Sequence, residues 1–188
     1  YKFPVPLNDS SRAFDWLVTN SKKFGIEESK ICVGGDSAGA NLAAALCLKR
    51  RDESKSLPMA QLLFYPVTDL RCSTESYMDL ASGFLLTANM MRWFGDNYIK
   101  NKEDVLNPLV SPLLADSLDK IPPSIVVTAG FDPLRDEGFE YAEKLKLNNV
   151  NTIYREHEGL IHAFAQFGII PECRSAIKEA CRDLNSIS

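Results

Sequence analysis

The sequence predicts an α/β fold in which a mostly parallel sheet of about four strands carries helices on both faces. Short β-branched or fully apolar runs alternate four times with longer stretches of helical periodicity. This alternation is typical of parallel strands joined by helices that cover the sheet. The chain has 188 residues, of which 45% are hydrophobic and 24% are charged. These values suit a single globular domain over residues 1–188.

The first half of the chain predicts two helices and two strands. A helix is expected over residues 8–24 because apolar residues recur there at helical spacing, with a cap at residues 9–11 and Gly25 at its end. Three further elements follow along the chain: a β-branched strand over 30–34, a helix over 38–51 and an apolar strand over 60–67.

Residues 69–122 form a long insertion between strands, and such insertions are usually functional. Thr87 is the predicted N-cap of a helix within it, and two prolines make residues 107–114 irregular. Beyond the insertion, the sequence predicts strands over 124–129 and 151–156, a helix over 133–148 with Phe139, Ala142 and Leu145 on one face, and helical structure from residue 163 with a break near Pro171.

The stretch from Gly35 to Gly39 reads GDSAG and matches G-x-S-x-G between a predicted strand and a predicted helix. A serine on so tight a turn has a strained backbone, and side chains in place of Gly35 and Gly39 are expected to clash. The turn presents the Ser37 hydroxyl at the carboxyl end of the sheet and directs the Ala38 N–H toward an oxyanion beside it. The motif therefore predicts a nucleophile, with a simple helix N-cap as the alternative.

Particular residues exclude three other glycine-rich or serine-containing sites. A P-loop requires a lysine, but none follows before Lys49. A dinucleotide-binding turn that starts at Gly34 needs glycine where Asp36 stands, and a Ser-x-x-Lys site needs lysine where Ala40 stands. Gly34 has no assigned role in this interpretation.

A serine nucleophile needs a base, and histidine is the usual one because its pKa of about 6.5 suits neutral conditions. The chain has two histidines, His157 and His162. His162 follows the last predicted strand, on the sheet edge expected to hold Ser37, so it is the predicted base, with a helix-start histidine as the alternative. His157 lies between Glu156 and Glu158 and predicts a surface ion pair. The two histidines do not predict a metal site, because no third ligand is evident.

The acid is expected on another loop that follows a strand, and Asp132 occupies such a position. An aspartate before Pro133 is also a good N-cap, and one carboxylate can serve both purposes. Asp136 and Glu137 are expected to favour the helix dipole from its first turn, with Arg135 as an ion-pair partner. The chain order serine, aspartate, histidine is the one expected for α/β-hydrolases.

With these residues assembled, the chain resembles the hormone-sensitive-lipase-like family of α/β-hydrolase fold serine esterases. Four stretches carry the resemblance, which spans essentially the whole chain: GDSAGANLA from Gly35, YPVTD from Tyr65, DPLRDEG from Asp132 and GLIHAF from Gly159. The resemblance implies Ser37 as nucleophile, His162 as base and Asp132 as the acid that orients it. It also implies short- to medium-chain acyl esters as substrates.

One feature of the family is absent from this sequence. The family has a His-Gly-Gly-Gly-type loop whose N–H groups supply the rest of the oxyanion hole, and no such run occurs here. We therefore expect the chain to be the carboxyl-terminal portion of a longer esterase, with an apolar first strand whose free edge favours homo-oligomers. Ala40 and Ala163 also stand where the family often has glycine, which leaves the three predicted catalytic residues intact.

The predicted function is that of a carboxylesterase or lipase-like serine hydrolase that acts on a small-molecule ester without metal or cofactor. The insertion over 69–122 is expected to line the active site, and Phe84, Trp93 and Phe94 either wall an acyl pocket or pack in the core. Two alternatives remain. One is a non-catalytic small-molecule-binding homologue, against which His162 argues, and the other is a fragment that is inactive without its amino-terminal half.

Composition argues against several partners. The net charge of −4 does not favour nucleic acid or an anionic membrane, and the basic run at residues 49–51 is expected to be a solvated helix end. No apolar run approaches the roughly 18 residues of a membrane span. The five cysteines are an odd number without a C-x-x-C pair, which predicts free, mostly buried thiols in the reducing cytoplasm.

Overall fold

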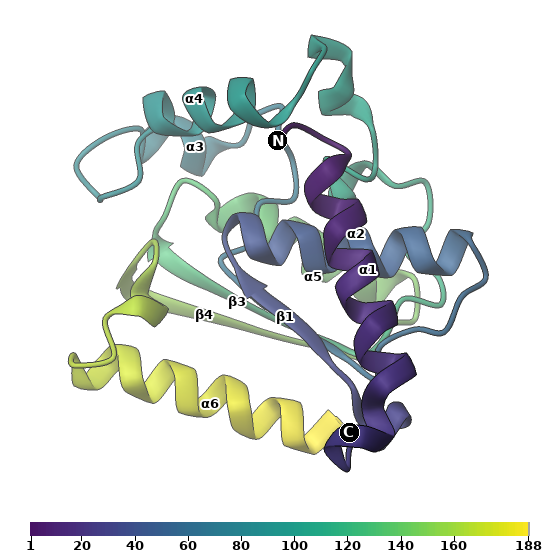
Figure 1. Cartoon of the computed structure of the whole chain (residues 1–188). Helices are drawn as coiled ribbons and strands as arrows, with labels where there is room; N and C mark the ends of the chain where they lie inside the picture. Colours follow the sequence, from purple (N-terminus) through teal and green to yellow (C-terminus); the bar gives the residue numbers. More distant parts are fainter. Residues whose placement is uncertain (188) are drawn as a thin grey trace.

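A four-stranded sheet forms the centre of the computed structural model, which describes residues 1–187 (Figure 1). The strands lie in the order β1-β2-β3-β4, and every neighbouring pair is parallel. Their bounds are β1 (Val33–Asp36), β2 (Gln61–Phe64), β3 (Ser124–Phe131) and β4 (Thr152–Ile161). The predicted fold class, a parallel sheet with helices on both faces, is confirmed.

Helices cover the two faces of this sheet unequally. The α-helices are α1 (Val5–Asn20), α2 (Ala38–Asp52), α3 (Glu75–Asp79), α4 (Ala88–Tyr98), α5 (Arg135–Leu147) and α6 (Pro171–Ile187). Short 3-10 helices are η1 (Ser21–Phe24), η2 (Glu28–Lys30), η3 (Lys102–Leu106), η4 (Pro112–Leu114) and η5 (Phe164–Gln166). Helices α2 and α5 lie on one face and α6 lies on the other (Figure 1).

The core alternates across the strands as a sheet buried on both faces requires. Leu63 and its register partner Val126 point into the layer of α2 and α5. Ile125 and Val127, the neighbours of Val126 along β3, point into the layer of α6. Since alternate residues of a strand face opposite sides, two separate apolar layers hold the strand ends in fixed positions.

Helix α1 packs against α2, and this contact corrects one prediction. The basic run at residues 49–51 is not a fully solvated helix end, because the Arg50 side chain is only 2% exposed. Its guanidinium donates to Asp15 of α1 at 2.6 Å and to the Ser56 carbonyl at 2.6 Å, and it stacks over the Phe14 ring. Arg50 therefore ties α1 to the end of α2.

The insertion over residues 69–122 contains α3, α4, η3 and η4. Helices α3 and α4 lie beyond the carboxyl ends of the strands (Figure 1). The predicted cap at Thr87 is confirmed, since its hydroxyl accepts a hydrogen bond from the Met90 N–H at 3.2 Å.

Several boundaries differ from the predicted ones. Helix α1 begins at Val5 and has no side-chain cap at residues 9–11, because the chain already turns at Pro4. Strand β1 starts later than predicted, since η2 occupies Glu28–Lys30. Strand β4 continues to Ile161 beside β3, past an irregular register. Phe139 is 45% exposed and packs edge-on against Tyr154 of β4, so it does not share the buried face of α5 with Ala142 and Leu145.

Two further features are the state of the cysteines and the character of the helices. All five cysteines are free; Cys47 and Cys173 are buried, whereas Cys181 is exposed. Within residues 1–187, no helix has both the length and the apolar character needed to cross a membrane.

Candidate active site

Ser37 lies at the sharp turn between β1 and α2. Its backbone has φ 52° and ψ −117°, a sparsely populated conformation with positive φ that costs about 1–3 kcal/mol for a residue with a side chain. Although Ser37 occupies the N-cap position of α2, its side chain makes no capping hydrogen bond. The strained turn aims the hydroxyl elsewhere, which argues against the simple N-cap interpretation.

The glycines around Ser37 have different steric roles. A Cβ at Gly35 would come within 2.4 Å of the Gly39 carbonyl carbon, so only glycine allows β1 and α2 to approach this closely. A Cβ at Gly39 would meet nothing nearer than 4.0 Å, so the expected clash of a side chain at that position does not occur. Gly34, which had no assigned role, would place a Cβ 2.9 Å from the Leu62 carbonyl oxygen.

His162 lies just beyond the end of β4 and bridges two of the predicted site residues. Its Nε2 is 3.0 Å from the Ser37 Oγ, and its Nδ1 is 2.7 Å from the Asp132 Oδ2. The imidazole is almost completely buried. The structure therefore brings together the three side chains predicted from the sequence, each from the end of a different parallel strand.

Asp132 follows β3 and is fully buried. One carboxylate oxygen, Oδ2, faces His162, and the other, Oδ1, accepts the Leu134 N–H at 2.9 Å. Helix α5 begins only at Arg135, so Asp132 satisfies a backbone donor just ahead of the helix. One carboxylate thus contacts both His162 and a backbone N–H, but the predicted N-cap position is wrong, because the N-cap of α5 is Leu134.

Tyr65, Asp36 and Gln166 also contact this site, although they were not predicted as site residues. The Tyr65 ring lies edge-on to the His162 ring with centroids 4.8 Å apart, and its hydroxyl is 3.5 Å from Asp36 Oδ2. The same oxygen accepts from Gln166 Nε2 at 3.2 Å. Burial raises the pKa of Tyr65, which keeps its hydroxyl protonated as a donor. The only signal in the sequence is that Tyr65 opens the YPVTD stretch.

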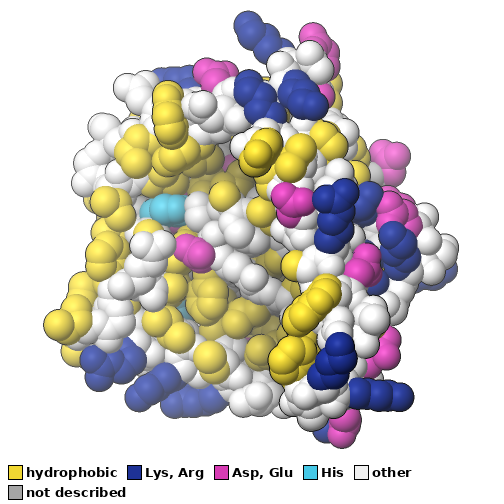
Figure 2. All heavy atoms as spheres, viewed as in Figure 1, with side chains coloured by type: hydrophobic (Ala, Val, Ile, Leu, Met, Phe, Trp, Pro, Cys, Tyr) yellow, Lys and Arg dark blue, Asp and Glu magenta, His cyan; other side chains and the backbone are white. Residues whose placement is uncertain are grey.

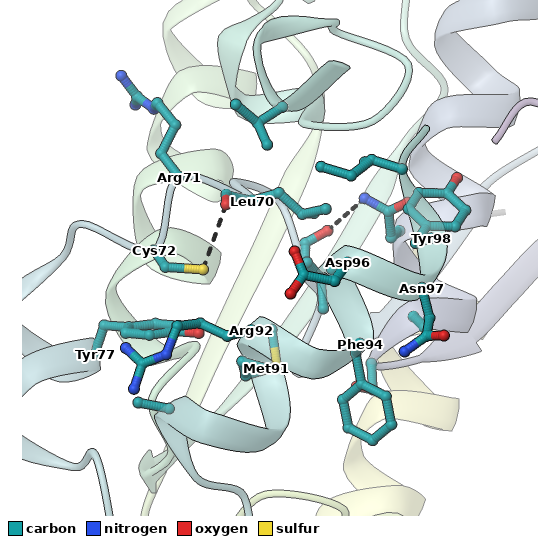
Figure 3. A pocket seen from close by; sticks show the side chains of 18 of the residues that line it. Leu70, Arg71, Cys72, Tyr77, Met91, Arg92, Phe94, Asp96, Asn97 and Tyr98 are labelled. Atoms are coloured by element: carbon teal, nitrogen blue, oxygen red, sulfur yellow. Dashed lines mark hydrogen bonds between the residues drawn. The ribbon is translucent and has the colours of Figure 1, made fainter. Parts of the chain in front are cut away.

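A pocket of about 1170 Å³ opens beside Ser37 and Ala38. Hydrophobic side chains surround the hollow between the α3–α4 layer and the sheet (Figure 2). Figure 3 shows Tyr77 and Cys72 on one side of the pocket, with Phe94 and Tyr98 from α4 on the other. The space is large enough for an ester with apolar groups.

Of the three aromatic residues considered for the pocket wall, Phe94 lines this pocket. Phe84 instead stacks on Phe131 with centroids 5.0 Å apart, and the Trp93 side chain is 62% exposed. Phe84 and Trp93 are absent from the pocket wall formed by residues 1–187, and none of the three is fully buried in the core.

The two acids lie in the first turn of α5, as predicted, and both also contact the insertion. Glu137 is fully buried, and its Oε1 accepts the N–H groups of Thr68 at 2.6 Å and Asp69 at 3.1 Å. Burial raises the pKa of Glu137 well above its usual range, and these two donors oppose the shift. Asp136 pairs with Arg135 at 2.9 Å, as predicted, and also contacts the insertion.

His157 does not form the predicted surface ion pair. Its Nε2 is buried and has no hydrogen-bond partner within residues 1–187, and its ring packs edge-on against Phe164. Burial lowers the pKa of His157, which favours the neutral imidazole. In the same part of the chain, no group of three His, Cys, Asp or Glu side chains is arranged to hold a metal ion.

The chemistry open to this arrangement follows from its geometry. A serine hydroxyl within hydrogen-bond distance of an imidazole nitrogen can transfer its proton to that nitrogen as it attacks an electrophile. A carboxylate on the opposite ring nitrogen holds the ring orientation and stabilises the imidazolium. Because Ala38 is the first residue of α2, its N–H has no acceptor within the helix and is available to an oxyanion.

The chain is similar to known ester hydrolases. The chain is 39% identical over 167 residues to the carboxylic ester hydrolase LipN of Mycobacterium tuberculosis, an overlap that covers 86% of this chain and 44% of LipN. It is 39% identical over 165 residues to an arylesterase of Saccharolobus solfataricus, covering 87% of this chain and 54% of that enzyme. The chain thus spans about half the length of the curated relatives it matches.

A solved structure and a family profile give the same result. The crystal structure of EstE1, a thermostable carboxylesterase cloned from a metagenomic library, superposes with a TM-score of 0.95 at 35% identity. That match covers 100% of this chain and 65% of EstE1. A profile described as alpha/beta hydrolase fold matches residues 1–166. The chain therefore belongs to the hormone-sensitive-lipase-like group of the α/β-hydrolase fold family.

Proposed function

We propose that the protein is a serine carboxylic-ester hydrolase that works through an acyl-enzyme. The observation that carries this proposal is the continuous contact from Ser37 Oγ to His162 Nε2 at 3.0 Å and from His162 Nδ1 to Asp132 Oδ2 at 2.7 Å. Relatives named as ester hydrolases support the same reaction class.

The proposed reaction has two halves. Ser37 Oγ attacks the ester carbonyl while His162 Nε2 takes its proton, and Asp132 stabilises the resulting imidazolium. As the tetrahedral intermediate collapses, the C–O bond to the alcohol breaks and His162 returns the proton to the leaving oxygen. His162 then accepts a proton from a water molecule that attacks the acyl-enzyme, and the carboxylic acid leaves.

The negative charge on the carbonyl oxygen needs hydrogen-bond donors. The Ala38 N–H supplies one at the positive end of α2. Loss of one oxyanion donor typically costs a factor of about 10² to 10³ in rate. The family resemblance assigns the remaining donors to a glycine-rich loop that the 188-residue sequence does not contain.

The proposed substrates are esters with short- to medium-length acyl chains. The pocket beside Ser37 is mostly apolar, and its lining includes Leu42, Val67 and Met91. An apolar wall stabilises an alkyl chain but offers little to a highly charged substrate.

The test is covalent labelling of purified protein with a fluorophosphonate probe, together with hydrolysis of p-nitrophenyl acetate. Ser37→Ala should abolish labelling and lower kcat by a factor on the order of 10⁶. Ser175→Ala, which changes an exposed serine on α6 outside the pocket lining, is the control and should retain full labelling. Absence of labelling and hydrolysis that depend on Ser37 would contradict the proposed function.

A further inference from the structure

Helices α3 and α5 begin close together, and neither has a side-chain cap of its own. The residue before α3 is Thr74 and the residue before α5 is Leu134, and neither makes a capping hydrogen bond. The first N–H groups of a helix lack partners within it, so each helix needs an acceptor from elsewhere.

The two helices supply these acceptors to each other. The Ser76 N–H of α3 donates to Asp136 Oδ2 at 2.7 Å, and the Asp136 N–H of α5 donates to Ser76 Oγ at 3.2 Å. The Ser76 hydroxyl also donates to the Pro133 carbonyl at 2.8 Å. Ser76 is completely buried, so none of its polar atoms has water as a substitute partner.

These contacts join two parts of the site that are far apart in sequence. On α3, the residues after Ser76 are Tyr77 and Met78, which line the pocket beside Ser37. On the other side, Pro133 directly follows Asp132, the residue that contacts His162. Tyr77 also packs in one buried apolar cluster with Leu134.

We propose that Ser76 and Asp136 are positioning residues that set the place of the pocket wall relative to Ser37, His162 and Asp132. Through that wall they determine the size of the ester that the pocket accepts. This inference rests on the proposed ester hydrolase function and adds a determinant of substrate size to it.

The direction of the effect follows from the size of the substrate. A long alkyl chain contacts the wall formed by Tyr77 and Met78, so displacement of α3 removes apolar contacts from its transition state. An acetyl group presents only one methyl group to the pocket, so its reaction should depend chiefly on the groups that contact the reacting carbon. Loss of the two hydrogen bonds between Ser76 and Asp136 therefore raises KM for long esters and leaves the acetate reaction almost unchanged.

The experiment measures kcat and KM of the intact protein for two series of esters. The acyl series compares p-nitrophenyl acetate with p-nitrophenyl octanoate, and the alcohol series compares ethyl acetate with octyl acetate. Ser76→Ala and Asp136→Ala each remove one partner. Asp136→Asn keeps an oxygen acceptor for the Ser76 N–H and serves as the conservative rescue. Asp79→Ala, an exposed acid on α3, is the matched control. Thermal unfolding of each variant reports whether it is folded.

In at least one of the two series, Ser76→Ala and Asp136→Ala should lower the ratio of long-chain to short-chain kcat/KM about tenfold, mainly through KM. Asp136→Asn should fall between these variants and the wild type, and Asp79→Ala should match the wild type. An unchanged ratio in both series, or an equal loss for long and short esters, would overturn the inference. If Asp136→Ala does not fold, Asp136→Asn and Ser76→Ala decide the outcome by the same criteria.

Failure of this inference is distinguishable from failure of the proposed function. A wild-type protein without Ser37-dependent hydrolysis would contradict the proposed function itself. A wild-type protein that hydrolyses esters, with variants that keep its chain-length profile, would contradict only the role of Ser76 and Asp136.

Discussion

The two oxygens of the Asp132 carboxylate have separate partners, which makes their contributions separable by experiment. Oδ1 accepts the Leu134 N–H at 2.9 Å, whereas Oδ2 lies 2.7 Å from His162 Nδ1. The first contact stabilises the folded state, because a buried N–H without a partner costs about 1–3 kcal/mol. The second contact belongs to the proposed chemistry.

Asp132→Asn should retain the fold but not the activity. Its side-chain oxygen can still accept the Leu134 N–H, while its NH2 group faces His162 and favours the wrong imidazole tautomer. We expect a decrease in kcat of about 10⁴-fold and a free energy of unfolding within about 1 kcal/mol of the wild type. Asp132→Ala loses both contacts, so urea unfolding should show a larger destabilisation. Equal destabilisation of the two variants would contradict this separation.

Among the elements, α1 is joined to α2 by a partly buried ion pair. Asp15 of α1 and Arg50 of α2 are 2.6 Å apart, with the Arg50 side chain 2% exposed and that of Asp15 49% exposed. An exposed pair on the same helix, between Asp9 and Arg12 at 3.3 Å, has side chains 61% and 81% exposed. Because the Arg50 side chain is buried, loss of its ion-pair partner should cost more free energy of unfolding than loss of the exposed pair.

Asp15→Ala should destabilise the protein by about 1–3 kcal/mol, because it leaves the buried Arg50 guanidinium without its carboxylate. Asp9→Ala should change the free energy of unfolding by less than about 0.5 kcal/mol, since solvent screens that pair. Urea unfolding of the two single variants gives the comparison. Equal effects would show that Arg50 gains no more from its partner than an exposed arginine does.

Elements were predictable where neighbouring residues determine them. The cap at Thr87 and the helix that begins at Ala38 follow from local sequence. The approach of Ser37, Asp132 and His162 was predictable because parallel strands end at one edge of the sheet. Arg50 was assigned to a solvated helix end and Glu137 to the helix dipole, since their partners Asp15 and Thr68 lie 35 and 69 positions away. Local patterns carry no information on such distant partners.

At the scale of the whole molecule, Glu137 joins the insertion to the domain. Its buried carboxylate accepts two backbone N–H groups at residues 68 and 69, and the Thr68 hydroxyl donates to the Glu137 carbonyl at 2.8 Å. Burial raises its pKa in the folded state above the usual 4.5. The stability contributed by protonated Glu137 is therefore complete below pH 4.5 and is lost as the pH rises through the folded-state pKa.

Glu137→Gln should reduce this dependence on pH, because the amide keeps an oxygen acceptor and cannot ionise. As the pH rises above 4.5, the wild type should lose more free energy of unfolding than the variant. Glu143→Gln, which removes an exposed carboxylate on the same helix, should retain the wild-type dependence. A variant whose stability changes with pH as steeply as the wild type would contradict a raised pKa at Glu137.

The distribution of Ser37, Asp132 and His162 over three parallel strands also has a kinetic consequence. Ser37 and His162 are 125 positions apart, and every neighbouring pair of strands is parallel and joined through a crossover. Contacts of such long range form late in folding, because loop closure must precede them. Partly folded chains therefore lack the assembled site. If Ser37 acts as proposed, it should react with a fluorophosphonate only after the sheet has formed, so that recovery of labelling during refolding would report completion of the fold.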